Sequence, residues 1–66
     1  MDEVTEFVHS KVMVKTYNGV SYQGVLLGID PYLNVVLQDV LINSQVKKSS
    51  LFIKGSNVLY IGLNVN

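Results

Sequence analysis

The sequence contains no cysteine, no arginine and no tryptophan, and it has one histidine and one proline. Without cysteine, disulfide bonds and thiolate metal ligands are excluded, and a small fold loses its usual covalent and metal supports. The single histidine, His9, has no second histidine beside which it could bind a metal, and it lies in a terminal segment. Because a catalytic arrangement needs a positioned base with an orienting partner, we expect no enzyme activity, no metal and no cofactor.

Long hydrophobic runs and an excess of positive charge are also lacking. No apolar run approaches the ~20 residues that span a bilayer, and the acidic start Met1-Asp2-Glu3 lacks the basic segment of a secretory signal. We therefore expect an intracellular protein without membrane contact. Five lysines balance five acidic residues, so the formal net charge is zero. Any contact with nucleic acid should therefore depend on stacking and hydrogen bonds rather than on many phosphate contacts, and we do not expect DNA binding.

With 66 residues, the chain is expected to form one domain over residues 1–66, without internal repeats or linkers. A domain of this size buries only about 60% of the surface that its unfolded chain exposes. Since disulfides and thiolate-bound metals are excluded, partner subunits are the expected source of additional stability.

The N-terminal residues Asp2 to Ser10 have the pattern of a short amphipathic helix. Val4, Phe7 and Val8 form one apolar stripe at helical spacing, and acidic residues precede His9 in the order that a helix dipole favours. Isolated helices shorter than about 12 residues are marginal in water, so this helix, at about 2–10, must dock on a sheet.

From Lys11 onward the pattern has a period of two, typical of strands. Asn18-Gly19 is a strong hairpin signal, and Gly24 and Gly28 inside the return strand indicate a bulge or bend in a curling sheet. The fold predicted for residues 11–63 is a strongly bent, five-stranded antiparallel open barrel. Its strands are expected at 11–17, 20–29, 35–40, 51–53 and 58–61, with residues 43–50 either a solvated connection or the start of the fourth strand.

The fourth and fifth strands are expected to be the two edges of this sheet. Val58-Leu59-Tyr60-Ile61 has no polar face, and an uncovered apolar edge is an aggregation risk unless it is paired. Pairing the fifth strand of one subunit with the fourth of the next is a head-to-tail contact that can close into a ring. We therefore predict a ring of subunits whose interface contains Phe52, Ile53, Val58, Leu59, Tyr60 and Ile61.

Two short polar turns, Asp30-Pro31-Tyr32-Leu33-Asn34 and Lys54-Gly55-Ser56-Asn57, follow the second and fourth predicted strands. In an antiparallel meander these turns emerge at the same end of the sheet, because alternate strands run in the same direction. A joint binding site is therefore expected. Taken singly, however, Asp30, Asn34 and the Lys54 turn are also what ordinary hairpin tips contain.

Together, these motifs resemble those of the Sm and Sm-like protein family. The resemblance covers roughly Lys11 to Leu63 and includes Asn18-Gly19, Gly24, the Asp30-x-Tyr32-x-Asn34 motif and the run from Ile53 to Val58. It implies a short N-terminal helix on a five-stranded barrel, a ring of seven subunits, and single-stranded uridine-rich RNA bound at the central pore. In eukaryotes it implies a ring on the 3′ end of the spliceosomal U6 RNA, a second ring in mRNA decapping and decay, and residence in both nucleus and cytoplasm.

The resemblance also implies roles for residues at the two turns. Tyr32 stands where the family stacks a side chain on a base, Asn34 where it hydrogen-bonds the uracil edge, and Asp30 where it orients the asparagine. Lys54 stands where the family usually has arginine, so weaker or less base-specific binding is expected, because an ammonium group cannot stack as a guanidinium does. Gly55 is expected to leave room for a ligand and Ser56 to offer a hydroxyl.

Three alternatives remain open at this point. The chain could be a spacer in a mixed ring whose neighbours hold the RNA, or a member of a ring of identical copies. It could also be an SH3-like module that binds peptides, although only Tyr32 supplies an aromatic side chain at a predicted tip.

Overall fold

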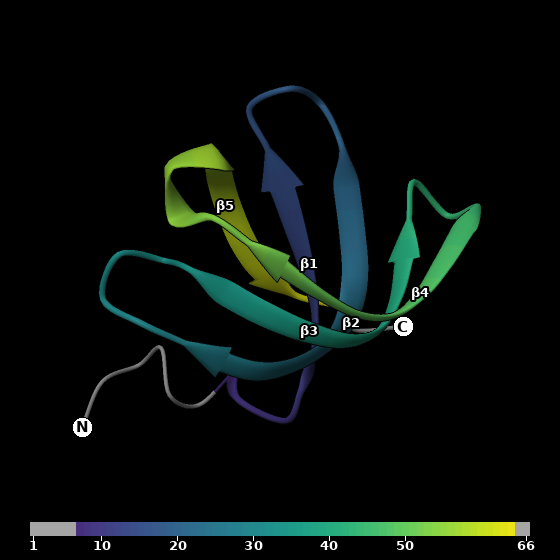
Figure 1. Cartoon of the computed structure of the whole chain (residues 1–66), viewed down its shortest axis with the longest axis horizontal. Helices are drawn as coiled ribbons and strands as arrows, with labels where there is room; N and C mark the ends of the chain where they lie inside the picture. Colours follow the sequence, from purple (N-terminus) through teal and green to yellow (C-terminus); the bar gives the residue numbers. More distant parts are fainter. Residues whose placement is uncertain (1–6, 65–66) are drawn as a thin grey trace.

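The computed structural model describes residues 7–64, which form one curled antiparallel sheet (Figure 1). The strand order is β4-β3-β2-β1-β5, and the sheet does not close. The all-β, five-stranded open architecture predicted from the sequence is therefore confirmed. The elements are β1 (Lys11–Thr16), β2 (Ser21–Ile29), β3 (Val35–Ile42), β4 (Val46–Ile53), the 3-10 turn η2 (Gly55–Asn57) and β5 (Val58–Leu63).

The bend of the sheet is centred on β2, as its glycines indicated. The β2–β3 register shifts between Gln23 and Val25 and again between Leu26 and Gly28. Gly24 is buried, and a Cβ added there would lie 2.9 Å from the carbonyl oxygen of Gln38. Only glycine therefore allows β2 and β3 to approach so closely at this point.

The core fills the inside of the curl with alternate residues from four strands and the start of β5. In β3 the inward positions run Val35 and Leu37 and then skip to Val40, because Asp39 adopts a positive φ of 55° and shifts the alternation by one residue. The fully or nearly buried apolar side chains are Val12, Val14, Leu26, Val35, Leu37, Val40, Ile53 and Val58.

The predicted N-terminal helix is wrong for the part of it that the structure describes. Its residues 2–6 lie outside the described residues, Phe7 has a 3-10 conformation, and residues 8–10 form a turn and a bend instead of an α-helix. His9 has a φ of 71°, which a right-handed helix does not permit, and its N–H donates to the carbonyl oxygen of Leu26 at 2.7 Å. Hydrogen bonds to β2 compete with the helix here, and so short a helix has little intrinsic stability with which to resist them.

The two edges of the sheet are β4 and β5, as predicted, but β5 does not continue the meander. It leaves β4 and pairs with β1 instead. Because β2 and β4 both pair antiparallel with β3, they run in the same direction and their ends lie at the same end of the sheet, as predicted. Phe52, Leu59 and Tyr60 are 62%, 47% and 52% exposed, whereas Ile53 and Val58 are 5% exposed in the chain's own core. The interface prediction therefore does not extend to the side chains of Ile53 and Val58, because each points inward.

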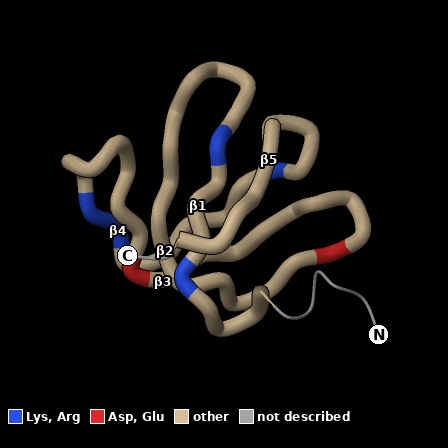
Figure 2. The backbone as a smooth tube through the Cα atoms, turned by 180° about the vertical axis from the view of Figure 1, so that it is seen from behind, with Lys and Arg blue, Asp and Glu red and all other residues tan. Residues whose placement is uncertain are grey.

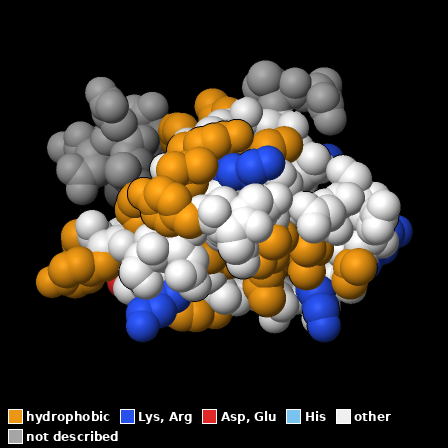
Figure 3. Space-filling model, turned by 90° about the horizontal axis from the view of Figure 1, so that it is seen from above, with side chains coloured by type: hydrophobic (Ala, Val, Ile, Leu, Met, Phe, Trp, Pro, Cys, Tyr) orange, Lys and Arg blue, Asp and Glu red, His pale blue; other side chains and the backbone are white. Residues whose placement is uncertain are grey.

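Figure 3 shows one face of the molecule, on which hydrophobic side chains gather in groups beside polar atoms and lysines. The polar stretch Lys47-Lys48-Ser49-Ser50, which the sequence left between two assignments, is part of β4. Within residues 7–64, no helix is long and apolar enough to cross a membrane.

Candidate nucleic-acid interface

The turn between β2 and β3 is organised around the carboxylate of Asp30. Its Oδ1 accepts the backbone N–H groups of Tyr32, at 2.9 Å, and of Asn34, at 3.0 Å. Its Oδ2 accepts the side-chain amide of Asn34 at 2.8 Å. Leu33 takes the left-handed conformation with a φ of 66°, and its N–H bonds to the Asp30 carbonyl at 2.9 Å. Asp30 therefore both shapes the turn and fixes the orientation of the Asn34 amide.

These hydrogen bonds lower the pKa of Asp30 below its ordinary value of 3.8, and the bond from the Asn34 side chain is the largest cause. Because the folded pKa is depressed, the contribution of Asp30 to stability is present above its unfolded pKa and is lost as the pH falls through the lowered folded value.

We accordingly expect acid to loosen this turn at pH values below about 4. The amide resonances of Tyr32 and Asn34, followed by NMR from pH 6 to pH 2, should shift with a midpoint below the ordinary aspartate value. Asp30→Asn should abolish that titration, whereas Asp39→Asn, which removes a carboxylate from β3, should leave it in place. A midpoint at or above the ordinary value would contradict the expectation.

The second turn is tied to the first by one hydrogen bond from backbone to side chain. The N–H of Gly55 donates to Oδ1 of Asn34 at 2.6 Å. Asn34 therefore bridges the two turns, with its nitrogen on Asp30 and its oxygen on Gly55. Figure 1 shows the β2–β3 turn and η2 on the same side of the molecule, although they are far apart in the sequence.

Gly55 is buried, and the space beside it is already filled. A Cβ added there would overlap the carbonyl oxygen of Tyr32 and would lie 2.7 Å from the carbonyl carbon of Tyr32 and 2.8 Å from that of Leu33. The prediction that this glycine leaves room for a ligand is therefore corrected: it leaves room for the other turn. The glycine at position 55 indicated a close approach of another group, but the sequence did not show that this group is the backbone of the β2–β3 turn.

The remaining candidate residues are open to solvent. Tyr32 is 79% exposed, and Lys54 and Ser56 are also exposed, while Asn34 is half-buried. The backbone of Asn57 stabilises this turn and links it to the β1–β2 turn. Its N–H donates to the Lys54 carbonyl at 2.9 Å, and its carbonyl accepts the N–H of Tyr17 at 3.0 Å. The structure thus gathers the predicted residues at one junction, with an aromatic ring, an oriented amide, a cation and a hydroxyl.

A small open sheet whose β2–β3 and β4–β5 turns are joined by one asparagine defines a barrel of the Sm class, and the comparisons agree. The model of the LSM domain matches residues 2–63. The U6 snRNA-associated Sm-like protein LSm6 of Lodderomyces elongisporus is 46% identical over 61 residues, with 86% of this chain and 76% of the relative covered. The chain belongs to the Sm-like family.

Two solved structures share this fold closely. The Sm protein of Pyrococcus abyssii, in complex with a uridine heptamer, is 31% identical with a TM-score of 0.85, and the match covers 92% of both chains. A heptameric archaeal Sm protein is 25% identical with a TM-score of 0.86, and the match covers 94% of this chain and 96% of that one. Several relatives at 36–46% identity over most of the chain bear the name LSm6, which agrees with the likeness of the run from Phe52 to Ile61 to the sixth eukaryotic Sm-like subunit.

Proposed function

We propose that the protein is a subunit of an Sm-like ring and binds single-stranded, uridine-rich RNA at the junction of the β2–β3 turn and η2. The observation that carries the proposal is the Gly55 N–H to Asn34 Oδ1 hydrogen bond, which unites the two motifs beside an exposed tyrosine. The uridine heptamer bound by the Pyrococcus abyssii protein supports the ligand class.

The Asn34 amide retains the groups that a uracil edge requires. A primary amide has two N–H donors and two lone pairs, and Asp30 and Gly55 use one of each. One donor and one acceptor remain, and they match the carbonyl and the N–H of uracil. Tyr32 offers a ring face for stacking, and the Lys54 ammonium is suited to a backbone phosphate. The chain thus binds and orients RNA rather than transforming it.

The ring itself follows from the unpaired edges. Phe52, Leu59, Tyr60 and the half-buried Ile61 line β4 and β5, and head-to-tail pairing of these strands between subunits would cover them. The heptameric archaeal relative supports a ring of seven. We propose that the natural ring is a mixture of Sm-like subunits and that isolated copies can assemble with themselves.

The cellular role follows from the relatives' names. The LSm6 relatives are U6 snRNA-associated, which supports a part for this chain in pre-mRNA splicing in the nucleus. We further propose that it also serves in a second, cytoplasmic ring in mRNA decapping and decay. In both rings, residues 1–66 would act as a single domain.

Truncation of the tyrosine tests RNA binding directly. In an assembled ring, verified by native mass spectrometry, Tyr32→Ala should weaken oligouridine binding by about tenfold or more, because stacking contributes ~1–3 kcal/mol per base. Tyr32→Phe should retain most of the affinity, and Tyr17→Ala, which removes an exposed tyrosine from the β1–β2 turn, should have little effect. Fluorescence anisotropy with labelled oligouridine measures all three.

A spacer role is the second candidate, and Lys54 favours it, because this chain lacks the stacking cation that completes the pocket elsewhere in the family. Intact rings that keep full oligouridine affinity with Tyr32→Ala would support the spacer. A chain that remains monomeric and binds proline-rich peptide would instead support an SH3-like module.

A further inference from the structure

The zero net charge of the chain conceals an uneven distribution. Asp2, Glu3 and Glu6 precede the described residues, so residues 7–64 contain five lysines and only two aspartates. Two of the lysines, Lys47 and Lys48, are adjacent on the edge strand β4, and Figure 2 shows the lysines of this hairpin on the opposite side of the molecule from the β2–β3 turn. They are therefore not part of the RNA site described above.

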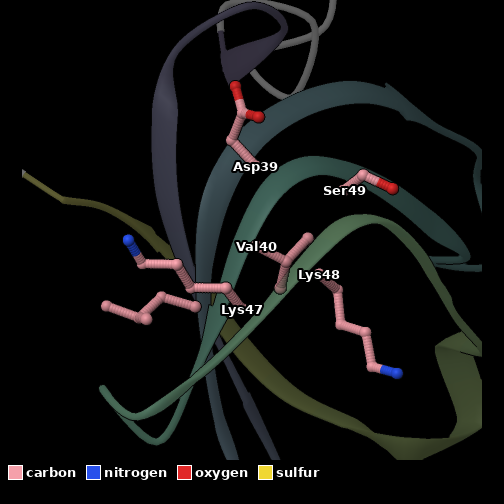
Figure 4. Close-up of a pocket in the computed structure, with 6 residues that line it drawn as sticks. Asp39, Val40, Lys47, Lys48 and Ser49 are labelled. Atoms are coloured by element: carbon pink, nitrogen blue, oxygen red, sulfur yellow. The ribbon is translucent and has the colours of Figure 1, made fainter.

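An open pocket with a volume of about 480 Å³ lies beside these lysines, on β3 and β4. It is lined by Asp39, Val40 and Leu41 of β3 and by Lys47, Lys48 and Ser49 of β4. In Figure 4 the carboxylate of Asp39 points away from both ammonium groups, and the two lysine side chains diverge. Adjacent strand residues point to opposite faces of a sheet, and both lysines are exposed, so one ammonium group on each face of β4 is free to meet a carboxylate from outside.

The geometry of strand addition determines which part of a neighbour would face these lysines. Every strand pair in this sheet is antiparallel, and β4 has β3 on one side only. An antiparallel strand added at β4 places its C-terminal end beside the N-terminal half of β4, where Lys47 and Lys48 lie. The hydrophobic Leu51, Phe52 and Ile53 would meet the beginning of that strand.

The chain's own β5 is a poor match for this half of β4. Its residues Val58–Leu63 carry no charge, and Asn64 follows. A second copy docked through β5 would thus bring no charged side chain of residues 58–64 to either ammonium group, while exposed lysines on an edge strand act against unwanted pairing. Specific partners commonly combine such a penalty with a complementary charge.

Resting on the proposed ring, we infer that Lys47 and Lys48 select the neighbouring subunit. The partner that fits is an Sm-like chain with aspartate or glutamate at the C-terminal end of its last strand. The lysine pair disfavours a second copy of this chain at β4 and favours a neighbour of that kind, so it helps to set subunit order.

The charge preference can be tested with the chain itself as donor. Leu63→Glu/Asn64→Asp supplies the missing carboxylates on a strand end that is exposed at Leu63. This variant should self-associate about tenfold more tightly than the wild type at ~50 mM salt, and the gain should shrink at ~500 mM salt. Adding Lys47→Glu/Lys48→Glu should reverse it. The matched control Tyr17→Glu/Asn18→Asp places the same two changes in the β1–β2 turn and should give no gain.

The natural neighbour can be identified because the chain lacks cysteine. Ser49→Cys, carrying a photoreactive maleimide in rings purified from the native cells, should crosslink to a peptide with an acidic residue at the end of the neighbour's last strand. A crosslinked peptide without such a residue, or self-association unaffected by the charge changes, would overturn the inference while leaving the ring intact.

Two other results would also overturn it. If Lys47→Glu/Lys48→Glu weakened oligouridine binding without changing assembly, the lysines would serve RNA. If the variant Asp2→Asn/Glu3→Gln/Glu6→Gln lost the self-association that the wild-type chain shows, the carboxylates that meet the lysines would come from a second copy of this chain. A chain that never assembles under any condition would contradict the proposed function instead.

Discussion

Gly55→Ala should destabilise the fold by about 1–3 kcal/mol, the range typical of overpacking. The added methyl group would overlap the carbonyl oxygen of Tyr32 and lie within 2.8 Å of two further backbone carbons. Backbone atoms cannot rotate away as a flexible side chain can, so the β2–β3 turn must move. That movement breaks the 2.6 Å hydrogen bond from Gly55 to Asn34. We expect a lower urea midpoint and, in assembled rings, weaker oligouridine binding.

The chain provides a matched control in Gly28. A Cβ added there meets no atom within 4 Å, so Gly28→Ala in β2 should leave both the urea midpoint and RNA affinity near wild type. Since Gly55→Ala moves the two turns apart without removing any side chain, a stable variant with full RNA affinity would show that contact between the turns is not needed for binding.

The sequence predicted the strands and the edges because these depend on local patterns. Glycine spacing in β2, alternation in β1 and the apolar run in β5 each have one simple structural reading. The N-terminal helix was wrong at residues 7–10 because its competitor is a long-range hydrogen bond from His9 to Leu26, and no local pattern reveals such a partner. The pairing of β5 with β1 agrees with the predicted edges, because a meander of the first four strands leaves β1 as the free neighbour for β5.

The candidate site shows the same division. The pairing of Asp30 with Asn34 was expected from the family resemblance, and it is a local interaction because both residues lie in one turn. The Asn34–Gly55 hydrogen bond joins residues 21 positions apart and was not predicted; the sequence predicted only that the two turns share one end of the sheet. Gly55 was expected to approach a ligand, but it lies against the backbone of Tyr32 instead. A glycine permits a close approach of either a ligand or another part of the chain, so the sequence alone does not distinguish the two.

Asn34→Asp should reduce oligouridine affinity by about tenfold or more at pH 7, although it changes one atom. The new oxygen would replace the nitrogen that now lies 2.8 Å from Oδ2 of Asp30, so a hydrogen bond becomes contact between two carboxylates. The site also loses the free N–H that we propose for uracil, because an ionised carboxylate only accepts. The bond from Gly55 to Oδ1 can remain, so the fold should survive.

The pH dependence distinguishes this mechanism from simple damage to the site. Two carboxylates at this distance favour one shared proton, which raises one folded-state pKa above the unfolded value. The shared proton stabilises the folded variant at pH values below this raised pKa, and that stability is lost as the pH rises through it. The urea midpoint of Asn34→Asp should therefore recover toward wild type as the pH falls from about 7 to about 4. Asn34→Ala, which loses both hydrogen bonds without adding a charge, should show no such recovery. Equal pH profiles for the two variants would mean that Asp30 does not face residue 34 in solution, and the orientation of the amide would need another cause.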